Sequence, residues 1–415
     1  DAALSDPQAG LSPALNQFFN AVQDVASNPT STAARQVLIS EAETLSDRFQ
    51  TLDGQIRSLK TAVNHEMETS IQQVNNIAGS IADINKEIVR AQGSAGGAPP
   101  NDLLDQRDGL VRQLSEFVNV SSNSQSDGSL NVFVGNGQAL VLGGTANTLA
   151  VIPNRFDVTE KEIAFVNGGN YTPITSQVNG GTLGGLLDVR SEILNVAQAN
   201  LGRLAMTVSS QFNTQHQLGD DLSGNAGGLF FDDIDVSAPR VLPSTNNNAA
   251  SGSISVSITD VTALEVSDYQ LNYDGANFNL VRLSDGVSVD SGFAVADLPR
   301  TVAAEGIQIS LTGSVSAGDS FLLQPMRNAA NQIGVAISDP AEIAAASSGS
   351  AVGNNDNALA LAALQTQRSM DNGIATYQES FSQLIADVGV KTNRASVAGE
   401  AQHALLNQAI QAKQS

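Results

Sequence analysis

Three isolated histidines are the side chains in this sequence that could most readily serve acid–base chemistry or bind a metal. His65, His216 and His403 lie far apart along the chain, and no His-Glu-x-x-His zinc motif is present. The chain contains no cysteine, which excludes disulfides, thiolate metal ligands and cysteine nucleophiles. A single histidine on or beside an apolar helical stripe is usually a surface or packing residue. The histidines therefore give no reason to predict a catalytic or metal site.

Two acidic clusters could serve paired-carboxylate chemistry or calcium binding. Asp105 and Asp108 share one face of an expected helix, with Arg107 beside them. Because the rest of that face is apolar, we expect an ion pair between helices there. The segment Phe231–Asp235 is rich in aspartate but does not match the calcium loop with its distal glutamate. We expect a solvated cluster at a β-sheet edge, where such charge opposes aggregation.

Glycine-rich segments provide no recognisable phosphate-binding or dinucleotide-binding motif. The sequence contains neither the G-x-x-x-x-G-K-[ST] phosphate loop nor the G-x-S-x-G nucleophile turn. The glycines between Gly180 and Gly185 lack the strand–turn–helix context and the acidic residue of a dinucleotide site. We expect a flexible junction between β-structure and a helix. Accordingly, we predict no catalytic, metal-binding or cofactor-binding residue and no enzymatic activity.

The composition of the 415-residue chain narrows the function classes further. Asp and Glu outnumber Lys and Arg by 42 to 20, for a formal charge of -22, which argues against binding nucleic acid or anionic lipid. Charged residues are 15% of the chain and aromatic residues 4%, so its polar surface must be mainly Ser, Thr, Asn, Gln and Gly. No apolar run approaches the ~18 residues of a membrane span. We find no signal peptide at Asp1, and the lack of cysteine suits a chain that is exported unfolded.

A long helix is the clearest structural prediction. Between residues 33 and 91, apolar side chains recur at alternating steps of three and four residues, which is typical of a coiled-coil-like stripe. Such a helix would be roughly 85–90 Å long. Ser31 or Thr32 is a suitable N-cap. The stripe consists of Leu38, Ala42, Leu45, Phe49, Leu52, Ile56, Leu59, Val63, Met67, Ile71, Val74, Ala78, Ile81, Ile84 and Ile88.

The remaining pattern alternates between helical and β-type periods. Helical spacing is found around residues 11–22, 101–117, 187–216 and from about 354 to the end. Strand-type alternation is found between residues 118 and 178 and between 230 and 323. Asp127-Gly128, Asn136-Gly137 and Asp274-Gly275 are typical of hairpin turns.

This order predicts an α+β multidomain fold in which the N- and C-terminal segments pair as an elongated antiparallel helical bundle. An apolar helical stripe must be buried against another helix, and the two chain ends are the available partners. The antiparallel β regions would be insertions. We expect the following parts: 1–120, first part of a helical rod domain; 121–182, inserted β region; 183–218, helix returning to the rod; 219–335, outer β domain; 336–415, second part of the rod.

Several segments resemble one family in the same order along the chain. The run from Leu103 to Val111, followed by Leu114-Ser115, resembles the most recognisable stretch of the flagellar hook-associated protein 1 family, the hook–filament junction proteins. Further segments agree over roughly residues 11–407. They are Ala34–Leu38, Gly181–Arg190, Phe212–His216, Gly313–Phe321 and Tyr377–Val388 with Gly389, Lys391 and Thr392.

The resemblance implies a structural flagellar protein, exported through the flagellar type III apparatus and assembled outside the cell as a ring at the distal end of the hook. It implies as partners copies of itself, hook protein, hook-associated protein 3 and an export chaperone. The two terminal helices that form the inner tube in the family have no counterpart here. We therefore expect a core fragment that is a monomer in solution.

The sequence leaves other classes open. Flagellin and hook-associated protein 3 share the helix–β–helix plan, and a secreted adhesin or surface-layer protein would share the acidic, cysteine-free composition. The stretch Asp105–Asp108 favours hook-associated protein 1. Our hypothesis is that one helical stripe makes most subunit contacts, so that polar residues flanking the seam, such as Gln55 and Asn64, would matter for assembly.

Overall fold

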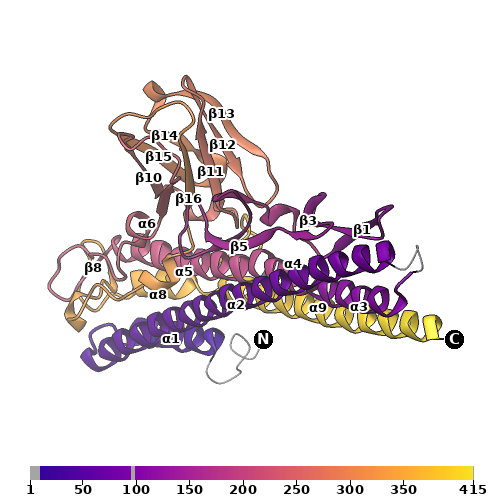
Figure 1. Cartoon of the computed structure of the whole chain (residues 1–415). Coiled ribbons are helices and arrows are strands. Elements are labelled where there is room, and N and C mark those ends of the chain that lie inside the picture. Colours follow the sequence, from indigo (N-terminus) through magenta and orange to yellow (C-terminus); the bar gives the residue numbers. More distant parts are fainter. Residues whose placement is uncertain (1–9, 95–98, 415) are drawn as a thin grey trace. The chain divides into compact units, whose positions relative to one another are not determined.

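The computed structural model describes residues 10–94 and 99–414; for part of the last helix only the backbone is described (Figure 1). Contacts within the chain define two compact units. Unit 1 contains the described residues up to Arg57 together with those from Asn195 onward. Unit 2 contains Ser58–Leu194. The longest helix contributes residues to both units.

The helices of unit 1 come from both ends of the chain. They are α1 (Leu11–Ser27), the first part of α2 (Thr32–Ser94), α5 (Asn195–His216), α8 (Asp356–Ala363) and α9 (Tyr377–Gln414). Both α1 and α5 pack against α8 and α9. The rings of Phe18 and Phe212 lie 5.1 Å apart, and Phe19 stacks on Tyr377 at 5.9 Å. The predicted bundle of N- and C-terminal segments with inserted antiparallel sheets is therefore confirmed.

Helix α2 buries almost all of the predicted stripe. Its members from Leu38 to Ile56 and from Val63 to Ile81, together with Ile88, are at most 8% exposed. Leu59 is the exception, because 52% of its surface is exposed, and Ile84 is half-buried. The Ser31 hydroxyl accepts a hydrogen bond from the Ala34 amide at 3.2 Å, which confirms the predicted N-cap.

Unit 2 adds two helices and two small antiparallel sheets to its part of α2. Helix α3 is Asn101–Phe117, and α4 (Gly181–Asp188) leads into a π-helical segment, Val189–Leu194. The first sheet has the order β1 (Val120–Ser124), β2 (Leu130–Val134), β3 (Gln138–Leu142), β4 (Thr145–Ala146). The second has the order β5 (Thr148–Pro153), β6 (Lys161–Asn167), β7 (Asn170–Pro173). Gly128 and Gly137 have φ of +85° and +93°, as the predicted hairpin turns require.

The β domain of unit 1, residues 240–324, contains two antiparallel sheets. The larger has the order β13 (Ser288–Ala294), β12 (Asn277–Arg282), β11 (Tyr269–Tyr273), β16 (Ser320–Gln324), β9 (Arg240–Pro243). The smaller has the order β10 (Ser253–Ile258), β15 (Ile307–Thr312), β14 (Arg300–Val302). Alternate side chains such as Leu271, Leu280 and Ile309 are fully buried, so the period-two pattern fixes which face of each strand forms the core.

Shorter elements join the β domain to the helices of unit 1. The two-residue strands β8 (Gly219–Asp220) and β17 (Ala346–Ser347) pair with each other. One-turn helices α6 (Ile234–Ser237) and α7 (Ala329–Gln332) flank the β domain in the sequence, and both pack on α5.

The C-terminal region corrects one prediction. We expected continuous helical spacing from about residue 354, but α8 ends at Ala363 and α9 begins only at Tyr377. Between them, Asp371, Asn372 and Gly373 have φ of +53°, +58° and +83°. Three successive left-handed residues reverse the chain and cannot belong to a right-handed helix.

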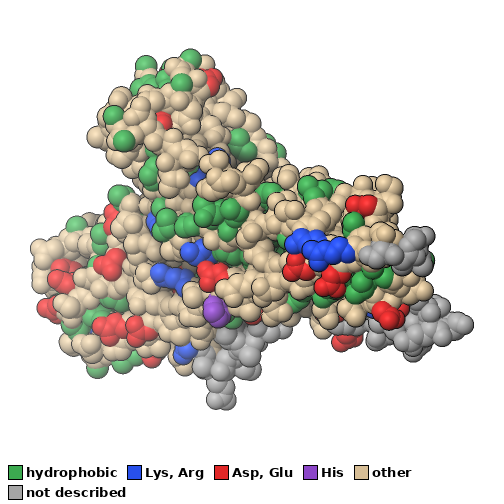
Figure 2. All heavy atoms as spheres, in the orientation of Figure 1, with side chains coloured by type: hydrophobic (Ala, Val, Ile, Leu, Met, Phe, Trp, Pro, Cys, Tyr) green, Lys and Arg blue, Asp and Glu red, His purple; other side chains and the backbone are tan. Residues whose placement is uncertain are grey.

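None of the helices within the described residues is long and apolar enough to cross a membrane. On the face drawn in Figure 2, charged side chains form only small groups. This surface agrees with the low content of charged residues in the sequence.

Candidate functional site

His216, at the end of α5, is a buried packing residue. Its Nδ1 donates to the Gly228 carbonyl at 2.9 Å, and its Nε2 accepts from the Ala344 amide at 2.8 Å. The ring is therefore neutral, with its proton on Nδ1. Burial is the largest influence on its pKa and lowers it, and the charge of Arg35 acts in the same direction. His65 is exposed on α2, and the side chain of His403 lies outside the described residues.

Arg35, near the start of α2, has almost no exposed surface. Its Nε donates to the Pro29 carbonyl at 2.7 Å, and its Nη1 donates to the carbonyls of Pro340 and Ile343 at 3.1 and 2.6 Å. The guanidinium thus ties the α1–α2 turn to the segment that follows α7. Its partners are backbone carbonyls, so this is an anchoring contact and not a catalytic arrangement.

The Asp105–Asp108 stretch is also structural. Arg107 is 7% exposed and donates from Nη1 to the Gly128 carbonyl in the β1–β2 turn, at 2.8 Å. Arg107 thus joins the helix to a hairpin, a contact that the sequence did not suggest. Asp105 faces solvent. No group of three or more His, Asp or Glu side chains among the described residues could hold a metal ion.

Two other sequence interpretations require correction. The aspartates near Phe231 do not lie on a β-sheet edge, because Ile234 begins α6; Asp232 and Asp233 are exposed, whereas burial raises the pKa of Asp235. The glycines from Gly180 form a close-packed junction and not a flexible one. Gly181 has φ of +57°, and a Cβ there would overlap the backbone at Phe117.

Three asparagines of α2 bind the backbone of the β region in unit 2. Asn85 is fully buried; its amide nitrogen donates to the carbonyls of Leu130 and Gly143, both at 2.8 Å, and its oxygen accepts from the Leu130 amide at 3.0 Å. Asn75 makes the same two-way contact with Leu149, at 2.8 and 2.9 Å. Asn75 thereby satisfies backbone groups of the edge strand β5, and Asn85 does so at the start of β2 and in the β3–β4 turn.

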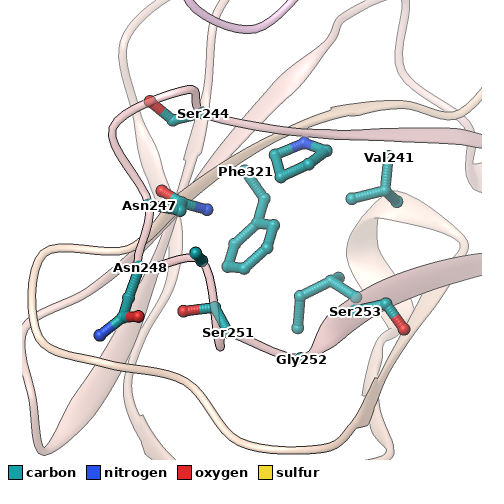
Figure 3. Close-up of a pocket in the computed structure, with 11 residues that line it drawn as sticks. Val241, Ser244, Asn247, Asn248, Ser251, Gly252, Ser253 and Phe321 are labelled. Carbon is teal, nitrogen blue, oxygen red and sulfur yellow. The ribbon is translucent and has the colours of Figure 1, made fainter.

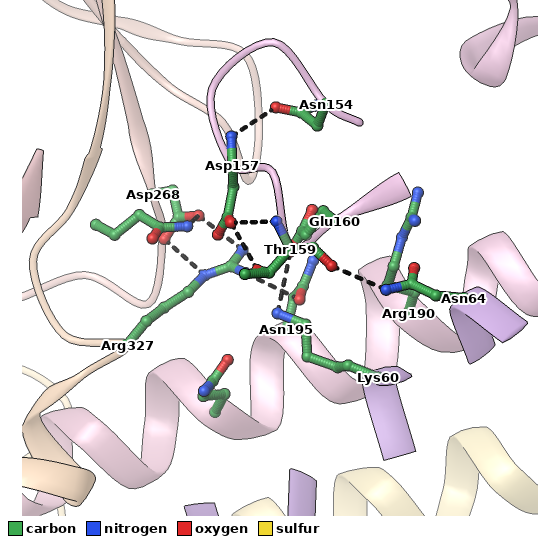
Figure 4. Close-up of polar contacts among 12 residues, drawn as sticks. Lys60, Asn64, Asn154, Asp157, Thr159, Glu160, Arg190, Asn195, Asp268 and Arg327 are labelled. Atoms are coloured by element: carbon green, nitrogen blue, oxygen red, sulfur yellow. Dashed lines mark hydrogen bonds and ion pairs between the residues drawn. The ribbon is translucent and has the colours of Figure 1, made fainter. Parts of the chain in front are cut away.

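Asn64 makes the third of these contacts, close to an ion pair. It donates to the Thr159 carbonyl at 2.8 Å, and Lys60 pairs with Glu160 at 3.0 Å (Figure 4). Asn64 is therefore engaged within the chain, and its expected part in assembly stays a prediction. Gln55 remains exposed. Asparagines at roughly ten-residue intervals could have been noticed in the sequence as polar positions beside an apolar stripe.

A cluster of charged and polar residues lies where the β domain and the turn between α8 and α9 meet α5. Arg327 binds both carboxylate oxygens of Asp268, at 3.0 and 2.6 Å, and donates to the Asn195 amide oxygen at 2.9 Å (Figure 4). Arg203 on α5 pairs with Asp371 at 2.5 Å. We call these five residues the domain clamp. The sequence analysis did not single out any of them.

A shallow pocket of about 390 Å³ lies in the β domain between the edge strands β9 and β10. Figure 3 shows the Phe321 ring inside it, with amide and hydroxyl side chains such as Asn248 and Ser251 around it. No charged side chain lines this pocket. It therefore offers no side chain that is ionised at neutral pH.

Exposed aliphatic side chains on α2 are candidates for contacts with other molecules. Val37 is 48% exposed and Leu59 is 52% exposed, although both lie on a helix whose other aliphatic positions are mostly buried. The buried polar side chains described above bind backbone or side-chain groups of the same chain. Such features define a structural subunit built on a helical bundle.

Comparisons with known proteins agree with this class. A family model described as flagellar hook-associated protein FlgK helical domain matches residues 1–231, and one described as flagellar hook-associated protein 1, D2-like domain, matches residues 242–325. The chain is 35% identical over 423 residues to flagellar hook-associated protein 1 of Salmonella typhimurium, covering 100% of this chain and 75% of the relative. For the Escherichia coli protein the values are 36% over 396 residues, 94% and 71%.

A solved structure gives the same result. The flagellar hook junction protein FlgK from Burkholderia pseudomallei matches with a TM-score of 0.88 and 28% identity, covering 99% of this chain and 95% of that chain. The chain belongs to the flagellar hook-associated protein 1 family. It is a structural component of the bacterial flagellum, at the junction of hook and filament. The comparisons thus favour this family over the alternatives that the sequence left open, which were flagellin, hook-associated protein 3 and a secreted adhesin or surface-layer protein.

Proposed function

We propose that this chain assembles with copies of itself into a ring that joins the flagellar hook to the filament and is needed for filament assembly and motility. Its further partners would be hook protein on one side, hook-associated protein 3 on the other, and an export chaperone before assembly. The observation that carries this proposal is the match of the whole of this chain to hook-associated protein 1, together with the bundle that both parts of unit 1 form.

The proposal includes an extracellular location, reached through the flagellar type III export apparatus. The absence of cysteine supports this route, because an unfolded chain that reaches the oxidising exterior then carries no thiol that could form an unwanted disulfide before folding. The formal charge of -22 supports a partner that is neither nucleic acid nor an anionic membrane. We also propose that the protein has no enzymatic activity and needs no cofactor.

We retain the five-part domain organisation as a proposal. Residues 1–120, 183–218 and 336–415 would form the helical rod, residues 121–182 an inserted β region, and residues 219–335 an outer β domain. The pairing of α1 and α5 with α8 and α9 supports the shared rod. The match of the D2-like family model to residues 242–325 supports the outer domain.

Loss of the full-length gene tests the junction role. We expect mutant cells to build hooks but to release unpolymerised filament subunits into the medium, and the unmodified full-length gene to restore filaments and swimming. Electron microscopy of the cells and immunoblots of the medium measure both. Cells that lack hooks altogether, or that carry normal filaments, would contradict the proposal.

We further propose that an exposed face of the helical rod, and not the β domain, makes most subunit contacts, and that the isolated chain is a monomer. Val37→Glu and Leu59→Glu in the full-length protein would place a charge on exposed aliphatic positions of α2. The matched control is Val287→Glu, because Val287 is 47% exposed and lies at the β12–β13 turn.

We expect both helix variants to fold normally and to prevent junction assembly, while the control variant supports swimming. Circular dichroism confirms folding, and size-exclusion chromatography with light scattering checks the monomer. Normal swimming with both helix variants, or loss of swimming with the control alone, would refute the assignment of the interface to the exposed face of α2.

A further inference from the structure

The β domain is joined to the helices of unit 1 through two very short connections. Only Ala238 and Pro239 separate α6 from the first strand β9, and residues 325–328 separate the last strand β16 from α7. Ala238 is fully buried, and proline has a fixed φ. Such connections lack the exposed, polar character of linkers that allow domain motion.

A bidentate ion pair lies at the exit connection. Arg327 is 13% exposed and Asp268 6% exposed, so water screens their attraction only weakly. Both carboxylate oxygens of Asp268 accept from Arg327, and Gln324 adds a bond at 3.2 Å. The remaining Nη1 of Arg327 binds Asn195, the first residue of α5. The planar guanidinium of Arg327 therefore fixes both the distance and the direction from Asp268, directly before β11, to the start of α5.

A second ion pair comes from a different segment. The 9%-exposed side chain of Arg203 binds Asp371 and also donates to the Leu264 carbonyl of the β domain at 3.5 Å. Asp371 has φ of +53°, a conformation that is costly for a residue with a side chain. The pair with Arg203 stabilises this turn against α5, close to the point where the β domain meets the helix.

Direct backbone contact completes the junction. A Cβ at Gly202 of α5 would overlap the carbonyl oxygen of Met326, so only glycine allows the helix to approach the exit connection this closely. The turn Val261–Ala263 also packs on α5, and α6 packs on β10. The β domain is thus held on the same helix at several separate points.

We infer that the domain clamp holds the β domain in one fixed orientation on α5 and that the junction requires this orientation. The first part concerns the isolated chain, whereas the second part rests on the proposed function. Asn195, Arg203, Asp268, Arg327 and Asp371 are positioning residues: they set where the β domain is presented and need not contact a neighbouring subunit themselves.

A distance measurement tests the first part. The chain has no cysteine, so Gln17→Cys on α1 and Val287→Cys in the β domain, both exposed positions, can carry two spin labels without interference. The test variant combines Arg203→Gln with Arg327→Gln. The control is Arg300→Gln, which removes another bidentate pair, Arg300–Asp290, at 2.8 and 3.1 Å, that lies wholly inside the β domain.

We expect one narrow distance in the parent chain and in the control, and loss of that single distance in the test variant. Circular dichroism checks that each variant is folded. If the double variant does not fold, Arg327→Lys keeps the charge without the bidentate geometry and should still broaden the distribution. An unchanged narrow distance in a folded clamp variant would overturn the inference.

Swimming assays with the full-length protein test the second part. We expect the clamp variant to be exported and to assemble poorly, with most of the swimming lost, while Arg300→Gln swims normally. Normal swimming despite a broadened distance would overturn the requirement for a fixed orientation. Failure of the unmodified gene to restore filaments would instead count against the proposed junction role.

Discussion

Replacing Asn85 by alanine should release the β1–β4 sheet from α2 while leaving the helix itself intact. The side chain is fully buried and makes three hydrogen bonds, all to the backbone of Leu130 and Gly143. Alanine is a better helix former than asparagine, so α2 gains slightly in propensity. The loss is therefore confined to the contact between helix and sheet.

The magnitude follows from the bonds that disappear. A typical intramolecular hydrogen bond contributes about 1 kcal/mol net, so three bonds correspond to about 3 kcal/mol. Because ~1.4 kcal/mol is a tenfold change in an equilibrium constant, local opening of the sheet should become about 100-fold more frequent. Asn75→Ala removes two bonds to Leu149 and should cost about 2 kcal/mol.

Hydrogen exchange measured by mass spectrometry resolves this effect, because it reports local opening and does not require two-state unfolding of the whole chain. Peptides within residues 120–146 should exchange faster in Asn85→Ala. The control is Asn76→Ala, since Asn76 is exposed and adjacent to Asn75, and should change stability by less than about 0.5 kcal/mol. Equal exchange in both variants, or faster exchange spread over unit 1, would refute the reasoning.

Three further predictions concern unit 1 and the α3–α4 junction. Relative to His216→Gln, the parent chain should lose stability as pH falls below about 6.5. Burial lowers the folded-state pKa of His216, so the unfolded chain binds the proton first, and the stability that neutral His216 contributes is lost as pH falls through the folded-state pKa. Urea unfolding at several pH values measures this loss. Gly202→Ala should destabilise unit 1 by about 1–3 kcal/mol through overlap with Met326, and an unchanged melting curve would disprove that contact. Gly181→Ala should destabilise the α3–α4 junction by a similar amount, visible as faster exchange near Phe117, whereas Gly185→Ala, with open space at its Cβ, should not.

The elements were predictable where a single period runs through the segment. The stripe of α2, the Asn101 start of α3 and the hairpins at Gly128 and Gly137 all follow from spacing and turn chemistry. Leu59 departs from the stripe because periodicity reports which face a residue occupies and not whether a partner covers that face. The break after Ala363 was missed because the helical spacings on its two sides were taken as one segment, although the run Asp371-Asn372-Gly373 between them is a turn signal in the sequence.

The polar anchors were not predictable by the same means. The spacing of the asparagines shows where Asn85 lies on α2, but nothing in the sequence identifies its backbone partners or the distant carboxylate that pairs with Arg327. Arg107 was singled out, but its partner was expected on a helix and is a turn carbonyl. A side chain that can bond any backbone group carries no information in its own sequence about which group it bonds.

The composition and these anchors are two aspects of one physical solution. With aromatic residues at only 4% and no cysteine, the chain has few large side chains and no disulfides to specify how its sheets meet its helices. Buried amide and guanidinium groups supply that specificity, because a misplaced sheet would leave Asn85 or Arg107 buried without partners, at a cost of about 1–3 kcal/mol or more for each such group. These directional contacts, which the apolar stripe cannot provide, therefore favour one position of the sheet on its helices. A chain of this composition in which such residues were replaced by leucine should still collapse onto its helices, but with its sheets in several registers.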